Sequence, residues 1–228
     1  MESFIVLVIF IGAIVFVPRY FTFRGSNYKT ASGNSFLKTL FDRGNYGEYL
    51  TFLYLEKIEG NKRLLTNLYI PRKDGTTTEI DLIMISEKGI YVFESKNYSG
   101  WIFGDEKNRN WTQTLNNRRK NYFFNPIWQN KAHINALKSV VGIDDARLYK
   151  SYIIFSERCT LKKVHVTSPE VKVLKRNDLI KAIKKDFIFS EKVLTTQQVD
   201  ELYFKLRKYS CIDDAVKREH VQHIQMKR

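Results

Sequence analysis

The chain has 228 residues, enough for one domain with a well-packed core and a short appendage, but hardly for two full domains. Its 38 Lys and Arg residues outnumber 24 Asp and Glu, and the formal net charge of +14 favours an anionic partner, nucleic acid first and an anionic membrane surface second. Two isolated cysteines exclude a disulfide framework or a cysteine-rich zinc motif, and they favour a reducing compartment.

An uninterrupted apolar run occupies residues 4–17. It is shorter than the ~20 residues that a transmembrane helix prefers, and it falls within the size of a signal-peptide core. No Lys or Arg precedes it and no small-residue cleavage site follows it, whereas basic residues follow from Arg19 onward and favour a cytoplasmic C-terminal side. We therefore expect residues 1–23 to form a single-pass anchor in the cell membrane with the remaining chain in the cytoplasm. A cleaved signal peptide and a buried apolar helix are the alternatives.

The polar residues 24–35 suggest a linker, and residues 36–58 then have helical spacing. Residues 63–71 read as a strand that ends at Pro71, and residues 78–100 as two strands around the turn "SEKG". Residues 101–125 appear irregular, basic and aromatic. Further elements are expected as a helix at 126–141, strands at 149–156, 164–166 and 171–174, helices at 177–187 and 195–209, and a basic tail at 211–228. This order predicts a mixed α/β fold around a small sheet.

Three charged residues interrupt the two apolar strands around "SEKG". If the loop between the strands has an even number of residues, paired residue numbers sum to 175 and Asp81 lies opposite Glu94. Lys96 then points to the same face, because side chains alternate along a strand. Two facing carboxylates in a semi-buried sheet need compensation, by a divalent cation such as Mg²⁺, by a shared proton, or by pairing with Lys96 in a structural ion cluster.

The segments "GEYLTFLYLE", "TEIDLIMISEKGIYVFESKNYSG" and "NPIWQNKAHINAL" together resemble the nuclease-related domain, NERD, of the PD-(D/E)xK, restriction-endonuclease-like superfamily. The resemblance covers roughly residues 40–142. It implies an α/β fold with a restriction-endonuclease-like core of helix, three-stranded antiparallel meander, helix and strand, which we place at residues 36–210 behind the N-terminal transmembrane helix. Ser95 stands where such domains frequently have Thr, a departure that leaves the backbone carbonyl in place.

The resemblance also implies roles for individual residues. Asp81 and Glu94 become the metal-binding acids, with the Ser95 backbone carbonyl as a further ligand and Lys96 as the catalytic lysine. Glu48 matches the acid of the first helix, where it would complete the coordination of Mg²⁺ through water or hold a second ion, and Mn²⁺ is a possible substitute. Gln129 matches the glutamine of the helix after the sheet, where it orients water or a ligand. His133 lies one helical turn further on, and a packed or substrate-side position is favoured over a metal or acid role.

The stretch at residues 101–124 interleaves basic and aromatic side chains, which neutralise phosphates and stack on bases in nucleic-acid complexes. The residues that we expect to bind nucleic acid are Lys107, Arg109, Trp111, Arg118, Arg119 and Lys120. A solvated basic loop with its aromatic rings in the core is the alternative. The leading interpretation is thus a membrane-anchored, Mg²⁺-dependent nuclease that acts on DNA more than RNA. The others are a catalytically silent nucleic-acid-binding or scaffold module and a protein whose basic face meets anionic lipid.

Overall fold

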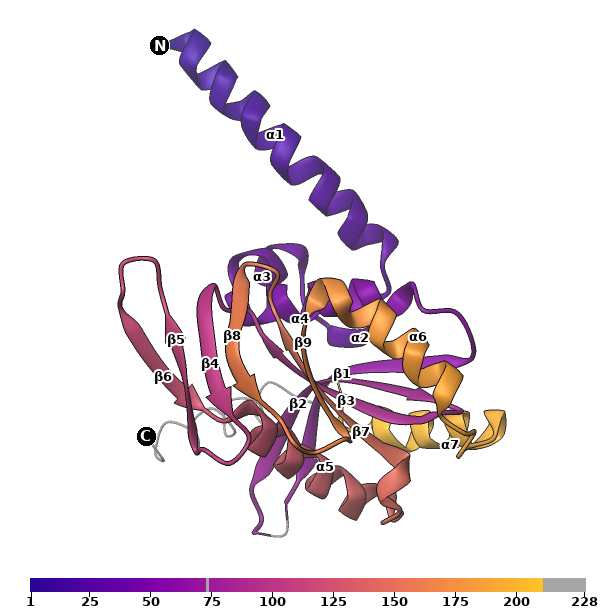
Figure 1. Ribbon diagram of the computed structural model, residues 1–228. Coiled ribbons are helices and arrows are strands. Elements are labelled where there is room, and N and C mark those ends of the chain that lie inside the picture. The colour runs from indigo at the N-terminus through magenta and orange to yellow at the C-terminus, as the bar shows by residue number, and fades with distance from the viewer. Residues whose placement is uncertain (73, 211–228) are drawn as a thin grey trace.

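The computed structural model describes residues 1–72 and 74–210, and it has an α/β architecture with two sheets (Figure 1). The helices are α1 (Glu2–Gly25), α2 (Tyr28–Ser32), α3 (Phe36–Phe41), α4 (Arg43–Glu56), α5 (Pro126–Val141), α6 (Leu179–Phe189) and α7 (Thr196–Arg207), with short 3-10 turns at Ala146–Leu148 and Arg176–Asp178. The strands are β1 (Lys62–Pro71), β2 (Thr77–Ser86), β3 (Gly89–Lys96), β4 (Gly100–Asp105), β5 (Asn110–Thr114), β6 (Lys120–Phe124), β7 (Tyr149–Phe155), β8 (Cys159–His165) and β9 (Val171–Lys175). The predicted basic tail at residues 211–228 lies outside the described residues.

The larger sheet has the order β1-β2-β3-β7-β9, in which β1, β2 and β3 form an antiparallel meander and β7 and β9 add in parallel. The β2–β3 hairpin pairs Ser86 with Gly89 and Leu82 with Phe93, so paired numbers sum to 175 as the sequence predicts. Gly89 allows this tight turn because its φ is +124° and a Cβ there would lie 2.6 Å from the Leu148 carbonyl oxygen.

Helices cover both faces of this sheet (Figure 1). On one face, α5 and α7 bury Leu137 and Val199 against strand residues such as Ile83. On the other face, α4 and α6 bury Phe52 and Ile183 with a second set of strand residues. Because both faces are covered, β2 and β3 are apolar on both sides, which is the pattern that the sequence shows for them. This core is consistent with the predicted restriction-endonuclease-like arrangement.

A second sheet, with the order β6-β5-β4-β8, lies beside the first (Figure 1). Our expectation of an irregular segment at residues 101–125 was therefore wrong. Strands β4, β5 and β6 are only five or six residues long, and polar turns separate them. The alternation of buried and exposed side chains along each strand is therefore brief. It is nevertheless present, because Ile102 and Trp111 are buried while Trp101 and Tyr122 are exposed.

The N-terminal part of the domain contains more separate helices than its sequence suggests. The predicted helix at 36–58 consists of α3 and α4, which separate at Asp42, where the side chain of Asp42 caps α4 by accepting a hydrogen bond from the Asn45 N–H. The predicted linker at 24–35 contains α2, whose Tyr28 is completely buried. This segment is therefore part of the packed domain.

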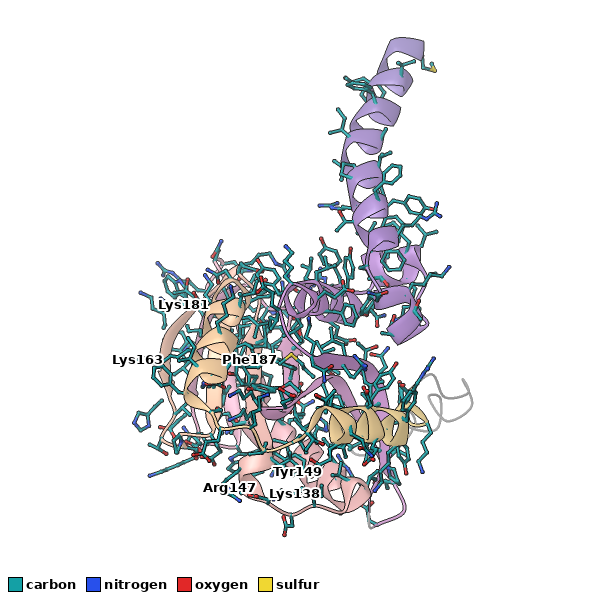
Figure 2. The ribbon with its side chains drawn as sticks, turned by 90° about the vertical axis from the view of Figure 1, so that its right-hand side faces the viewer. Lys138, Arg147, Tyr149, Lys163, Lys181 and Phe187 are labelled. Carbon is teal, nitrogen blue, oxygen red and sulfur yellow. The ribbon has the colours of Figure 1, made fainter. Side chains whose placement is uncertain are left out.

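Helix α1 projects away from the domain (Figures 1 and 2). Phe23, near its C-terminal end, packs into the core. Several apolar side chains of α1 that precede Phe23 are exposed, among them Phe4, Phe10 and Phe21. Within residues 1–72 and 74–210, however, no helix has both the length and the apolar character needed to cross a membrane. The predicted transmembrane helix is therefore not supported.

Candidate active site

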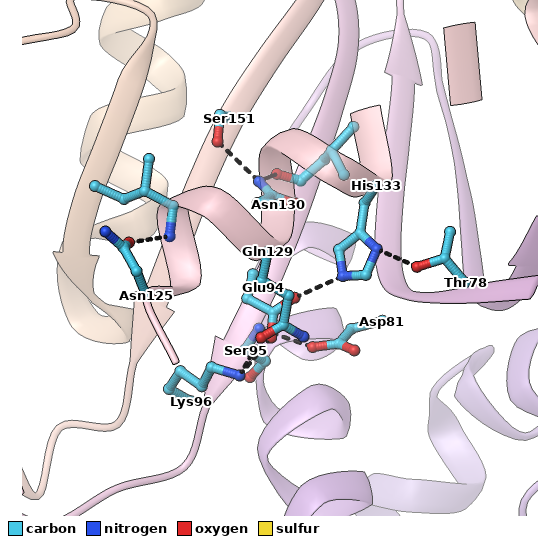
Figure 3. Close-up of polar contacts among 12 residues, drawn as sticks. Thr78, Asp81, Glu94, Ser95, Lys96, Asn125, Gln129, Asn130, His133 and Ser151 are labelled. Carbon is cyan, nitrogen blue, oxygen red and sulfur yellow. Dashed lines mark hydrogen bonds and ion pairs between the residues drawn. The ribbon is translucent and has the colours of Figure 1, made fainter. Parts of the chain in front are cut away.

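The two acids of the β2–β3 hairpin lie together at the end of the hairpin opposite its turn (Figure 3). The last pair of the β2–β3 ladder is Leu82 with Phe93, and Asp81 and Glu94 follow immediately beyond it. Oδ2 of Asp81 accepts a hydrogen bond from the backbone N–H of Ser95 at 2.9 Å. The register of a local hairpin thus places both acids and the Ser95 backbone in one small region.

Glu94 is the centre of a buried polar network (Figure 3). Its residue is 1% exposed, and Lys96 donates a hydrogen bond from Nζ to its Oε1 at 2.6 Å. Nζ of Lys96 also donates to Oε1 of Gln129 at 3.1 Å. The structure therefore brings together three predicted site residues that come from β3 and α5.

His133 occupies the second oxygen of Glu94, with Nε2 3.1 Å from Oε2. The other ring nitrogen, Nδ1, lies 2.8 Å from Oγ1 of Thr78 on β2, and the His133 residue is 4% exposed. The sequence indicated only that His133 shares a helix face with Gln129. Its contact with Glu94 gives it a place in the network, and nothing in the sequence pattern identified Thr78 as its partner.

Two asparagines hold α5 in the position that these contacts require. The Asn125 side chain caps the helix by accepting a hydrogen bond from the Ile127 N–H at 2.9 Å. Nδ2 of Asn130 donates to the carbonyl oxygen of Val92 on β3 and to Oγ of Ser151 on β7. These buried bonds fix the face of α5 that carries Gln129 and His133 toward β3.

Glu48 approaches the acids from α4, where Gly47 allows close contact with the chain after β3. A Cβ at Gly47 would lie 2.8 Å from Cβ of Asn97. Oε2 of Glu48 is buried, and among the described residues it has no hydrogen-bond partner. Burial first, and then the charges of Glu79 and Glu94, raise the pKa of Glu48 to about 8.

The other two acids have opposite pKa shifts. Burial, followed by the charges of Glu94 and Glu48, raises the pKa of Asp81 well above its usual range. Burial also acts to raise the pKa of Glu94, but the charge of Lys96 and the hydrogen bond from His133 outweigh it and lower that pKa. Burial would lower the pKa of Lys96, yet the charges of Glu94 and Asp81 raise it. Glu94 and Lys96 therefore form an ion pair, whereas neither Asp81 nor Glu48 forms one with another described residue.

The donor chemistry of this cluster suits a hard divalent cation, because its oxygens come from carboxylates and a backbone carbonyl. The unpartnered oxygen of Glu48 and the raised pKa of Asp81 both identify carboxyl groups whose ionised forms a cation would stabilise. Over the ranges that the structure describes, however, no three His, Cys, Asp or Glu side chains form a group that could hold a metal. The residues fit such an ion in chemistry without forming a closed cage.

The side chains predicted to bind nucleic acid separate into two groups. Lys107, Arg109, Arg118, Arg119 and Lys120 are exposed around the second sheet. Trp111 is 1% exposed, and its indole stacks on Phe155 with the ring planes 3° apart while Nε1 donates to the Asp105 carbonyl oxygen. The prediction that Trp111 contacts nucleic acid was therefore wrong, because the alternation of β5 turns this residue into the core.

The fold and the cluster at the end of β3 define an α/β protein of the restriction-endonuclease-like superfamily. The family model for the nuclease-related domain, NERD, matches residues 43–156, which include Glu48, the hairpin acids, Lys96 and Gln129. The chain is also 36% identical over 186 residues to an uncharacterized protein of Bacillus anthracis, covering 81% of this chain and 85% of that protein. It therefore belongs to the NERD family. No solved structure gave a significant match.

Proposed function

We propose that this protein is a divalent-metal-dependent nuclease that hydrolyses phosphodiester bonds, in DNA rather than in RNA. The observation that carries the proposal is the convergence of Asp81, Glu94, Lys96 and Gln129 at one end of β3. Membership of the nuclease-related family supports the same chemistry. The net charge of +14 favours a polyanionic substrate.

Lys96 supplies a positive charge that is fixed in position. Its ammonium group is held between Glu94 and Gln129, and the two nearby acids raise its pKa, so it stays protonated at neutral pH. A protonated amine stabilises negative charge that grows on phosphoryl oxygens in the transition state, whereas a general base has to be neutral. We therefore assign charge stabilisation, and not proton abstraction, to Lys96. Gln129 fixes the direction in which this amine points.

Mg²⁺, with Mn²⁺ as a possible substitute, would be held by Asp81, Glu94 and the Ser95 carbonyl, with Glu48 contributing through water. When bound, such an ion makes a water molecule more acidic and offsets charge on the phosphate. Asp81 and Glu48 have raised pKa values in the protein without metal, so cation binding would displace protons from them. To coordinate the ion, Glu94 would have to give up part of its hydrogen bonding to Lys96 and His133.

The test uses the full chain, purified in a mild non-ionic detergent because α1 exposes apolar side chains. Supercoiled plasmid, linear duplex, single-stranded DNA and single-stranded RNA are incubated with Mg²⁺, Mn²⁺ or EDTA. We expect cleavage of DNA with either metal, none with EDTA, and none with D81N or K96M. The exposed Lys181 on α6 provides the control variant K181M. Metal-dependent cleavage that persists in D81N would show that another site performs the reaction.

A catalytically silent nucleic-acid-binding or scaffold module is the second candidate. The observation in its favour is that Lys96 and His133 already occupy both oxygens of Glu94, which resembles a structural ion cluster. This candidate predicts salt-sensitive binding of nucleic acid without turnover under any metal condition. It also predicts that D81N and K96M bind as tightly as the natural chain.

Attachment to the cell membrane through α1, with the domain in the cytoplasm, is a separate proposal. Its support is the apolar run at residues 4–17 and the exposed apolar side chains of the projecting helix. Fractionation of cells that express the tagged chain tests it. The chain is expected in the membrane fraction and resistant to extraction with high salt, and recovery in the soluble fraction would contradict the proposal.

A further inference from the structure

The second sheet has an outward face that is rich in aromatic and basic side chains. Trp101 on β4 is 50% exposed, and Tyr122 and Phe124 on β6 are 72% and 46% exposed. Lys120 on β6 and Lys162 on β8 are also exposed. We call these five residues the stacking face. Exposed rings on three positions of one sheet are unusual unless something covers them.

The strand register places these residues on one side of the sheet. Trp101 on β4 pairs with Thr114 on β5, which in turn pairs with Lys120 on β6. Two residues away along β5 and on the same side of the sheet, Thr112 pairs with Tyr122. Because side chains alternate, the intervening residues Ile102 and Trp111 point to the opposite side, where they are buried. Neighbouring strands lie ~4.8 Å apart, so Trp101 and Tyr122 are separated by about 10 Å across the sheet.

Basic groups adjoin the rings of this face. Nζ of Lys162 lies 5.5 Å from the centre of the Trp101 ring. Arg158, just before β8, lines a cavity of about 470 Å³ together with Trp101 and Asn117. The nearby acids are engaged elsewhere, since Asp105 lies 3.3 Å from His165 and Glu106 accepts hydrogen bonds from Thr167 and Ser168. Lys120, Lys162 and Arg158 outnumber these two acids, so the net charge around the rings is positive.

The stacking face is continuous with the candidate active site. Nη2 of Arg158 donates to the backbone carbonyl oxygen of Asn97 at 3.0 Å and to its side-chain Oδ1 at 2.9 Å. Asn97 directly follows Lys96, and β4 begins at Gly100. Arg158 therefore places a cation between Trp101 and the end of β3 that carries Lys96.

We propose that the stacking face binds unpaired, single-stranded nucleic acid, with bases stacked on Trp101 and Tyr122 and phosphates against Lys120, Lys162 and Arg158. Aromatic rings beside cations match a ligand that has flat π faces and a negative backbone. A duplex keeps its base faces in the stack, so it gains nothing from these rings. The inference rests on the proposed function in so far as nucleic acid is the substrate, and it narrows that substrate to strands with unpaired bases near the cleavage point.

The experiment measures binding of fluorescein-labelled dT12, rU12 and a blunt 12-base-pair duplex to the full chain in detergent, by anisotropy in EDTA, where the proposed cleavage cannot occur. We expect dT12 to bind more tightly than the duplex. W101A and Y122A should each weaken dT12 binding roughly 5- to 150-fold, because stacking contributes about 1–3 kcal/mol per base. W101F should retain most of the affinity. F204A, at an aromatic residue that is 67% exposed on α7, and K181A are the matched controls and should bind as the natural chain does.

Several results would overturn the inference. These are a preference for the duplex, dT12 binding that W101A and Y122A leave unchanged, and self-association that these variants abolish in a chain that binds no dT12. The last result would assign the face to a second copy of the chain. Comparison of dT12 with rU12 shows which sugar the face accepts. Binding that depends on Trp101 without metal-dependent cleavage would support the face and contradict the nuclease proposal, whereas cleavage without ring-dependent binding would contradict the face alone.

Discussion

The ammonium of Lys96 lies 2.6 Å from Oε1 of Glu94, and this ion pair is buried at the end of the central hairpin. The same carboxylate meets His133 at its other oxygen. Glu94 therefore joins β3 to α5 through His133, and Lys96 of the same strand adds a second link through its hydrogen bond to Gln129. Substitutions around it should separate its contribution to stability from its contribution to catalysis.

Replacement of Lys96 tests the charge-stabilising role. In K96M, DNA cleavage with Mg²⁺ should fall by about 10²- to 10³-fold, the range expected when one group that stabilises transition-state charge is lost. Glu94 also loses a buried partner, so the melting temperature should decrease. K181M, at an exposed residue of α6, should change neither quantity. Full cleavage by K96M would contradict the assignment of Lys96 to the reaction.

The raised pKa of Glu48 predicts a pH-dependent stability in the absence of metal. Between its usual value of 4.5 and about 8, the folded chain holds a proton on Glu48 that the unfolded chain has lost. This contribution to the free energy of unfolding is complete below pH 4.5 and disappears as pH rises through 8. E48Q should remove this dependence and raise the melting temperature at pH 9 by a few °C, since 1 kcal/mol corresponds to about 2–4 °C in a chain of this size.

Thermal melts of the natural chain and E48Q in EDTA, from pH 5 to pH 9, provide the measurement. E48D keeps the charge and serves as the matched variant, so its melting temperature should still decrease toward pH 9. If E48Q and the natural chain have parallel pH profiles, Glu48 is not the group responsible. Added Mg²⁺ should raise the melting temperature of the natural chain more than that of E48Q.

Removal of the His133 ring should destabilise the protein. H133A leaves Oε2 of Glu94 without its partner in a buried region, which costs roughly 1–3 kcal/mol, and the Thr78 hydroxyl keeps only its hydrogen bond from Arg72 among the described residues. H133Q offers an amide that can restore part of this bonding. H165A is the control, because His165 is exposed and its ring lies 3.3 Å from Asp105 at the surface. Chemical denaturation gives the free energies of unfolding, and equal values for H133A and H165A would contradict the role of the network.

Gly47 should control the distance between α4 and β3. In G47A the new Cβ would lie 2.8 Å from Cβ of Asn97, so the helix that carries Glu48 has to move away from the strand. We expect a loss of 1–3 kcal/mol in stability and lower cleavage activity. G25A is the matched control, since no atom lies within 4 Å of a Cβ at that position. Unchanged stability and activity in G47A would show that the two elements are not held as closely as described.

The sequence by itself determined the geometry of the hairpin. The two-residue turn at Glu87–Lys88 and the alternation of side chains fix the register over ten residues, so Asp81, Glu94 and Lys96 were predictable as a set. The span of α5 was also predictable, because Pro126 begins it and Gly142 ends it in the left-handed conformation that glycine favours. These features depend on interactions between residues that are close along the chain.

Only the tertiary structure decided which residues surround that hairpin. The contact between His133 and Glu94 spans 39 positions, and the parallel pairing of Trp101 with Thr160 joins strands that are far apart in the sequence. Short strands such as β5 and β6 have little periodicity of their own, so their register comes from the partners they pair with. For this reason the sequence placed Trp111 among the nucleic-acid contacts, whereas packing against Phe155 buries it and leaves Trp101 on the outer face.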